Sequence, residues 1–139
     1  MILIDDQLHV RVVAGLDVPE PISSSRRATT YGYQYRAVRA VRDDRREGAI
    51  SRHVPERDIE ILRVRVLHPQ PHCVVLDPRD TIGIAITYSL DHGPLNQIQA
   101  ELLGAAAYHD ITDIYLTAVS SHVETVASAL GINIHLTTY

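Results

Sequence analysis

The sequence predicts an α/β domain of three layers (α/β/α), in which a short, mainly parallel sheet of about four strands lies between helices. Three observations lead to this prediction. Short apolar runs alternate with longer segments of helical spacing, which is the order of strands joined by helical crossovers. The runs are apolar throughout, as in strands covered by helices on both faces. The length of 139 residues is typical of one domain, expected to span residues 1–139.

Four segments have the character of short buried strands. The first begins at the N-terminus, where Ile2, Leu3 and Ile4 precede two aspartates that stop the run. Each of the other three follows a helical segment and a short polar or proline-containing stretch, as a strand after a crossover should. The expected strands are residues 2–4, 74–76, 114–117 and 132–136.

The segments between these strands have helical periodicity, and several carry end signals. Thr29 or Thr30 can cap the clearest helix, because a Thr side chain accepts hydrogen bonds from first-turn amides. Asn96 opens a second strong helix, and Gly131 is the residue directly after the last helix, where glycine commonly ends a helix. A loop rich in Pro and Ser is expected over residues 17–25. The expected helices are residues 7–15, 29–46, 52–67, 80–90, 96–109 and 123–130.

The composition excludes several classes of function. All 13 basic residues are Arg, so chemistry that needs a lysine amine is excluded, including pyridoxal enzymes, Walker-type nucleotidases and kinases. The single cysteine, Cys73, lies in an apolar run and is expected to be a buried, unreactive thiol, which suits a reducing compartment. No apolar stretch approaches the roughly 20 residues of a membrane span. We therefore expect a cytoplasmic protein that does not contact membranes.

Charge is distributed unevenly along the chain, although the net charge is only −4. Residues 26–65 contain eleven Arg and six acidic residues, a net charge of +5, whereas the rest of the chain carries −9. Such a basic segment is either an anion-binding face or a solvated helix surface.

One face of the helix at 29–46 has the make-up of an RNA-binding surface. Its arginines could neutralise phosphates, and three tyrosines just before them could stack on bases. Alternatively, the arginines form a solvated face paired with nearby acids and the tyrosines pack in the core, or the face docks an acidic protein partner. The residues concerned are Tyr31, Tyr33, Tyr35, Arg36, Arg39, Arg42 and Arg46.

Three acidic residues are candidates for a metal site. Asp5 and Asp6 follow the first strand, and a bound Mg²⁺ or Mn²⁺ would relieve the repulsion between adjacent carboxylates. The alternative is that one of them caps the next helix, where the helix dipole favours a negative charge. Glu101 lies within an apolar, Ala-rich helix, so it faces either solvent or a cleft.

Taken in order, these motifs resemble the PIN domain, a family of metal-dependent ribonucleases that are common as toxins of toxin–antitoxin pairs. The similar stretches are an apolar first strand ending in Asp5, a helix containing Glu101 and an Ala run, a strand ending in Leu116-Thr117, and a final helix and strand that include Ala129-Leu130-Gly131-Ile132. They lie within Met1–Gly15 and Asn96–Leu136, about 56 residues.

The resemblance implies a divalent-metal-dependent endoribonuclease, with Asp5, Asp6 and Glu101 as catalytic metal ligands and the Arg-rich helix holding RNA. It also implies an antitoxin-like protein as a partner, and it allows a homodimer. Two acids usual in the family are missing here. The segment after Leu116-Thr117 has none before Glu124, and the segment 29–35 has none. The alternative is therefore a catalytically impaired PIN-like module that binds RNA or a protein without cleaving.

Overall fold

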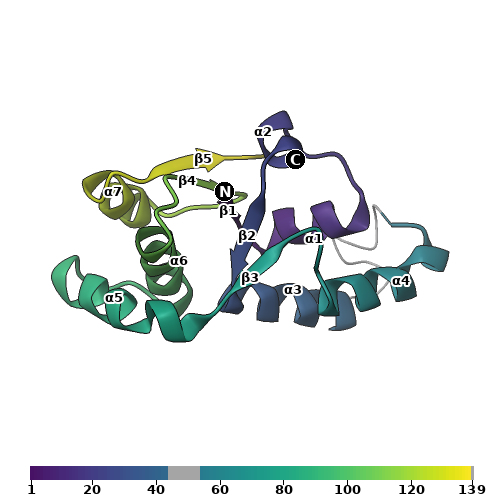
Figure 1. Ribbon diagram of the computed structural model, residues 1–139, viewed down its shortest axis with the longest axis horizontal. Helices are drawn as coiled ribbons and strands as arrows, with labels where there is room; N and C mark the ends of the chain where they lie inside the picture. The colour runs from purple at the N-terminus through teal and green to yellow at the C-terminus, as the bar shows by residue number, and fades with distance from the viewer. Residues whose placement is uncertain (44–53, 139) are drawn as a thin grey trace.

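A five-stranded, all-parallel sheet forms the centre of the computed structural model, which describes residues 1–43 and 54–138 (Figure 1). The strand order across the sheet is β3-β2-β1-β4-β5, so β1 lies in the middle. The strands are β1 (Ile2–Ile4), β2 (Arg27–Thr30), β3 (Val74–Leu76), β4 (Asp113–Leu116) and β5 (Asn133–Leu136). The predicted α/β class with a parallel sheet is confirmed.

Seven helices connect the strands in the part of the chain that the structure describes. Of the two threonines that could cap the clearest helix, Thr30 does so, and Asn96 caps the helix that it was expected to open. Ser120 caps a third helix, and in each case a side-chain oxygen accepts a first-turn amide hydrogen bond. Gly131 has the left-handed conformation (φ 72°) that ends α7. The helices are α1 (Asp6–Ala14), α2 (Glu20–Ser24), α3 (Tyr31–Asp43), α4 (Glu56–Leu67), α5 (Pro78–Asp91), α6 (Gln97–Tyr108) and α7 (Ser121–Ala129).

Helices cover both faces of the sheet because each strand is apolar on both sides. Leu3 and Ile114 point toward α6 and α7, where they join a cluster with Leu102 and Leu103. The alternate residues of the same strands, such as Ile4, pack on the other face with α1 and α2. Within the described ranges, no helix combines the length and the apolar character needed to cross a membrane.

The predicted number of about four strands is wrong, because the sheet also contains β2, which the sequence pattern does not predict. Its sequence, Arg27-Ala28-Thr29-Thr30, has no large apolar residue, and we assigned its last two residues to the following helix. The strand forms because β1 and β3 pair with it on both sides. The Thr29 hydroxyl is satisfied by donating to the carbonyl of Ile4 (3.0 Å), which lets a polar residue be fully buried. The loop predicted at 17–25 also contains the short helix α2.

The helices α1, α3 and α4 pack on one another beside the sheet and bury one histidine. His9 is fully buried, and its Nε2 lies 2.7 Å from Oε1 of Gln34. Since the Gln34 amide nitrogen donates to the carbonyl of Val66, Oε1 must accept, and Nε2 therefore carries the proton. The other ring nitrogen, Nδ1, is buried without a hydrogen-bond partner. Burial lowers the pKa of His9 from 6.5 to about 4.

The lowered pKa of His9 predicts a loss of stability in mild acid. The folded protein keeps His9 neutral, whereas the unfolded chain binds a proton below about pH 6.5. The free energy of unfolding should thus be highest above pH 6.5 and fall as the pH drops toward 4. From this group we expect a fall of about 2 kcal/mol between pH 7 and pH 4.5. Urea unfolding at both pH values measures it, and His9→Leu should show a correspondingly smaller fall. An equal fall in both proteins would contradict the prediction.

Candidate functional site at the carboxyl edge of the sheet

The order in which the chain adds strands to the sheet reverses between β1 and β4, so the carboxyl ends of these two strands form a topological switch point. From β1 the chain continues to β2 on one side, and β4 pairs with β1 on the other. In open α/β sheets, ligands bind in the crevice at such a point, beyond the carboxyl ends of the strands. Asp5, Asp6 and Thr117 follow these two strands directly, so the candidate site is built around them.

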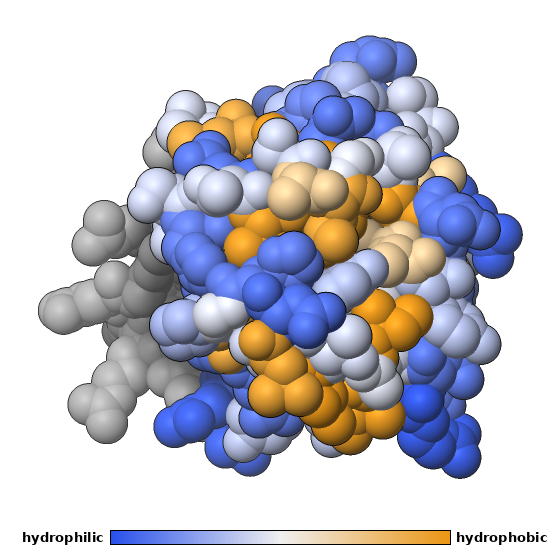
Figure 2. Space-filling model, turned by 90° about the vertical axis from the view of Figure 1, so that its left-hand side faces the viewer, coloured by the Kyte–Doolittle hydropathy of each residue, from blue (hydrophilic) through white to orange (hydrophobic). Residues whose placement is uncertain are grey.

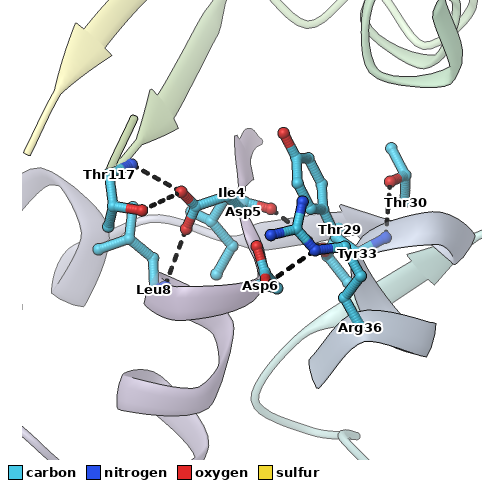
Figure 3. Close-up of polar contacts among 9 residues, drawn as sticks. All are labelled: Ile4, Asp5, Asp6, Leu8, Thr29, Thr30, Tyr33, Arg36 and Thr117. Atoms are coloured by element: carbon cyan, nitrogen blue, oxygen red, sulfur yellow. Dashed lines mark hydrogen bonds and ion pairs between the residues drawn. The ribbon is translucent and has the colours of Figure 1, made fainter. Parts of the chain in front are cut away.

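Asp5 is held by backbone and side-chain donors from two elements (Figure 3). Its Oδ1 accepts the amide hydrogen bond of Leu8 (2.9 Å) and so caps α1. Its Oδ2 accepts from both the amide (2.6 Å) and the hydroxyl (2.7 Å) of Thr117, at the end of β4. Asp5 is 4% exposed. The predicted cap at this position is therefore present, and the same carboxylate also joins β1 to β4.

Asp6 forms an ion pair with Arg36 of α3, in which Oδ2 lies 3.3 Å from the guanidinium Nε. The Asp6 side chain is almost fully buried, whereas Arg36 is about half exposed. Burial raises the pKa of Asp6, Arg36 counteracts this, and the neighbouring charge of Asp5 adds to the increase. An arginine thus supplies the positive charge beside the Asp5–Asp6 pair.

Glu101 reaches from α6 to the start of α3. Both of its carboxylate oxygens accept from the amide of Gly32, at 3.1 and 3.3 Å. A Cβ on Gly32 would lie 2.8 Å from Oε2 of Glu101, so any larger residue at this position would require the carboxylate to move. Burial raises the pKa of Glu101, and the backbone hydrogen bonds oppose the increase. Glu101 is therefore half-buried and directed toward α3, where it places a carboxylate at the N-terminus of that helix, and the helix dipole favours a negative charge there.

The charges of all three acids act on one buried tyrosine. Burial raises the pKa of Tyr33, and the charges of Asp5, Asp6 and Glu101 raise it further, while Arg36 partly counteracts them. The Arg36 guanidinium also lies 5.9 Å from the centre of the Tyr33 ring. The structure thus brings the predicted acids to one region, but each carboxylate interacts with a different protein group.

The three acids do not form a set of metal ligands. Mg²⁺ and Mn²⁺ need several oxygen atoms with lone pairs directed at one point. Oδ2 of Asp5 already accepts two hydrogen bonds, and Asp6 is paired with Arg36. Across residues 1–43 and 54–138, no group of three or more His, Cys, Asp or Glu side chains is placed to hold an ion. The donor set therefore does not fit the divalent metal that the resemblance implies.

A cleft of about 320 Å³ opens beside this region, beyond the carboxyl end of β4. Its walls include the capping residues of two helices, Asn96 and Ser120, together with Tyr33, Arg36 and Ala118. Ala118 lies in the segment where the resemblance expects an acid. The described residues that line the cleft include none of the three acids, so its polar character comes from neutral groups and one arginine.

The predicted RNA-binding residues divide into exposed and buried members. Arg36, Arg39 and Arg42 are exposed on α3, and Arg46 lies outside the described residues. Tyr31 and Tyr35 are more than half exposed. Tyr33, by contrast, is a core residue, as the alternative interpretation expected.

Two functional contacts were missed by sequence reasoning. Thr117 holds Asp5 and Gly32 accommodates Glu101, although they are 112 and 69 residues away in the chain. For Gly32 a signal existed, because a glycine within a helical segment often marks a close approach of another group. Thr117 carries no comparable signal in a single sequence.

Fold and site together define an α/β domain with a parallel sheet and a polar crevice between β1 and β4, where the strand order reverses. A scan against models of known protein families finds no match to this chain, and a search of curated proteins finds none of significant similarity.

The contacts of Asp5 predict that Asp5→Asn destabilises the protein. Asparagine has one acceptor oxygen, so its NH₂ group must face either the Leu8 amide or the Thr117 donors. We expect the free energy of unfolding, measured by urea in the presence of a chelator, to fall by about 2 kcal/mol.

Asp17→Asn, a change at an exposed aspartate, is the matched control and should alter stability by less than about 0.5 kcal/mol. If Asp5 were present chiefly to bind a cation, its neutralisation would relieve repulsion with Asp6. The metal-free Asp5→Asn protein would then be at least as stable as the parent. That result would contradict the structural role assigned here to Asp5.

Proposed function

We propose that the protein is a PIN-like module that binds single-stranded RNA along α3 and does not cleave it. The proposal rests on one observation, the exposed face of α3, which combines aromatic and basic side chains. Tyr31, Tyr35, Arg39 and Arg42 recur at intervals of three to four residues, so they lie along one side of the helix. All four are exposed.

The chemistry of this face matches a nucleic-acid strand better than a folded protein surface. Tyr35 offers a ring for base stacking, and arginines one and two turns further along can bind phosphates bidentately. The face begins at the carboxyl end of β2 and adjoins the cleft through Arg36, which lines it. A strand bound along α3 could thus continue toward the cleft.

We propose that the protein does not cleave RNA because its three candidate carboxylates are already engaged by other protein groups. Hydrolysis of a phosphodiester by metal ions needs carboxylates that hold the ion and orient the attacking water. Here the carboxylates of Asp5 and Glu101 accept hydrogen bonds at the starts of α1 and α3, and that of Asp6 pairs with Arg36. Ala118 offers no additional ligand.

Substitutions on α3 should weaken RNA binding. We expect Tyr35→Ala to raise the Kd for a fluorescent single-stranded RNA about tenfold, because stacking on one ring is worth about 1–3 kcal/mol. Arg39→Gln should reduce the slope of log Kd against log salt by about 0.7, because one phosphate contact is lost. Fluorescence anisotropy across a salt series measures both effects.

Matched controls separate this surface from general charge and aromatic content. Tyr108→Ala removes a half-exposed tyrosine at the end of α6, and Arg57→Gln removes a highly exposed arginine of α4. Neither should change the Kd by more than twofold. If all four variants behave like the parent, or if only an acidic protein partner binds α3, RNA binding is the wrong function.

Metal-dependent cleavage is tested separately. We expect isothermal calorimetry to show no Mn²⁺ binding at millimolar concentration and no cleavage of RNA in its presence. If cleavage is observed, the variants Asp5→Asn and Glu101→Gln test whether these carboxylates are required for it. Mn²⁺-dependent cleavage that both changes abolish, in variants that remain folded, would favour the endoribonuclease that the resemblance implies, with Asp5 and Glu101 among its ligands.

A further inference from the structure

The cleft beyond the carboxyl end of β4 contains a polar group of the core that has no partner in the protein. Tyr33 lines this cleft, and its side chain is only 8% exposed. Figure 3 shows its hydroxyl at the end of the ring that points away from α3. Among the described residues, none forms a hydrogen bond with this hydroxyl. Because an unpaired polar group in such a place costs free energy, a ligand that accepts its hydrogen bond would stabilise the site.

Three other polar side chains of the cleft also have hydrogen-bond donors to offer. Asn96 and Gln99 form the capping box of α6, in which each side-chain oxygen accepts a backbone amide hydrogen bond, at 2.9 and 3.0 Å. The NH₂ group of each side chain is therefore left to donate elsewhere. Ser120 caps α7 by accepting the amide hydrogen bond of Val123, so its hydroxyl proton is likewise available. The helix caps thus turn donors toward the cleft.

Arg36 adds a positive charge to these donors, and it is the one charged residue among the described residues that line the cleft. Its side chain is half exposed, and its Nε faces Asp6 at 3.3 Å. This contact leaves the terminal nitrogens of the guanidinium, which bind two oxygen atoms of a phosphate in the usual bidentate geometry. The dipoles of α6 and α7, whose N-terminal caps line the cleft, favour a negative charge there as well.

We propose that the cleft binds the phosphate group of a nucleotide, either a free nucleoside monophosphate or the phosphorylated end of an RNA strand. A phosphate supplies only acceptors when it is ionised, which matches this set of donors. The volume of the cleft lies at the lower end of the range of small-ligand sites, about 300–1,000 Å³. The proposal does not depend on RNA binding by α3. Apolar side chains suited to the ring of a base form the rest of the wall, namely Ile98, Leu102, Leu116, Val119 and Val123.

The larger groove along the outer face of α5 does not suit a phosphate. It has a volume of about 510 Å³, and its walls include the exposed side chains of Ile82, Ile86 and Leu90. Figure 2, which shows the side of the molecule that carries α5, has hydrophobic surface gathered in its lower part. Among the described residues that line this groove, the charged one is Glu101, which would repel a phosphate. The donors and the positive charge therefore distinguish the smaller cleft.

Asp6 competes with a phosphate for the charge of Arg36, whereas Asp5 and Glu101 do not line the cleft and accept hydrogen bonds from Thr117 and Gly32. Asp6→Asn removes this competing charge. We therefore expect it to lower the Kd for AMP, measured by isothermal titration calorimetry, at least twofold. An Asp6→Asn protein that binds AMP more weakly than the parent would overturn the placement of the phosphate beside Arg36.

A change of charge at one helix cap tests the site without removing the cap. Ser120→Asp keeps a good N-cap residue on α7 but places a carboxylate in the cleft, so the Kd for AMP should rise at least tenfold with little change in melting temperature. Ser128→Asp is the matched control, because Ser128 is exposed near the other end of α7, and it should change the Kd less than twofold. Tyr33→Phe removes only the hydroxyl and should raise the Kd about tenfold. Adenosine, which lacks the phosphate, should bind at least tenfold more weakly than AMP.

RNA with and without a 5′-phosphate distinguishes the two sources of the phosphate. If the end of a strand is the ligand, the phosphorylated RNA should bind at least tenfold more tightly than the 5′-hydroxyl form, and Ser120→Asp should remove the difference. If AMP binds and the 5′-phosphate has no effect, the ligand is a free nucleotide. Tyr35→Ala should leave the Kd for AMP unchanged, so failure of RNA binding by α3 is separable from failure at the cleft. Equal Kd values for Ser120→Asp and Ser128→Asp, or a parent that responds neither to AMP nor to the 5′-phosphate, would overturn the proposal.

Discussion

The hydrogen bonds of Asp5 hold together the edge of the sheet on which the candidate site is built. Its carboxylate caps α1 and accepts both donors of Thr117, so it joins the end of β1 to the end of β4. These strands are neighbours in the sheet although about 110 residues separate them. The parallel pairing of β1 with β4 brings the donors together, and the buried carboxylate satisfies them. The start of α1 and the junction between β1 and β4 thus share one carboxylate.

The acids of this chain show why metal ligands and helix caps are hard to tell apart. A metal ion and the first amides of a helix both require negatively charged oxygen atoms. Asp5 accepts a hydrogen bond from a first-turn amide of α1, and Glu101 accepts one from a first-turn amide of α3. Asp6 interacts with the guanidinium of Arg36, a cation that belongs to the protein itself. All three carboxylates thus have protein partners, and the proposal of a binding module is based on these contacts.

The exposed faces of α3 and α5 differ in chemistry. The face of α3 is basic and aromatic, which suits an anionic strand, whereas the outer face of α5 presents the apolar side chains of Ile82, Ile86 and Leu90. Glu101 lies at the boundary, since it lines the groove of α5 and also caps α3. Tyr31 lies at the edge of both faces, because it belongs to the exposed side of α3 and also lines the groove beside α5.

The sequence alone determined the α/β class, most of the helices and several of their caps, because apolar periodicity and capping residues act over a few positions. Asp5 was recognised as either a cap or a metal ligand, since both follow from its place after a strand. Only the tertiary structure decided that residues 27–30 form a strand, because their pairing with β1 and β3 overrides a polar composition. It also decided the partners of Asp5 and Glu101, which are set by contacts across 112 and 69 residues that local patterns do not encode.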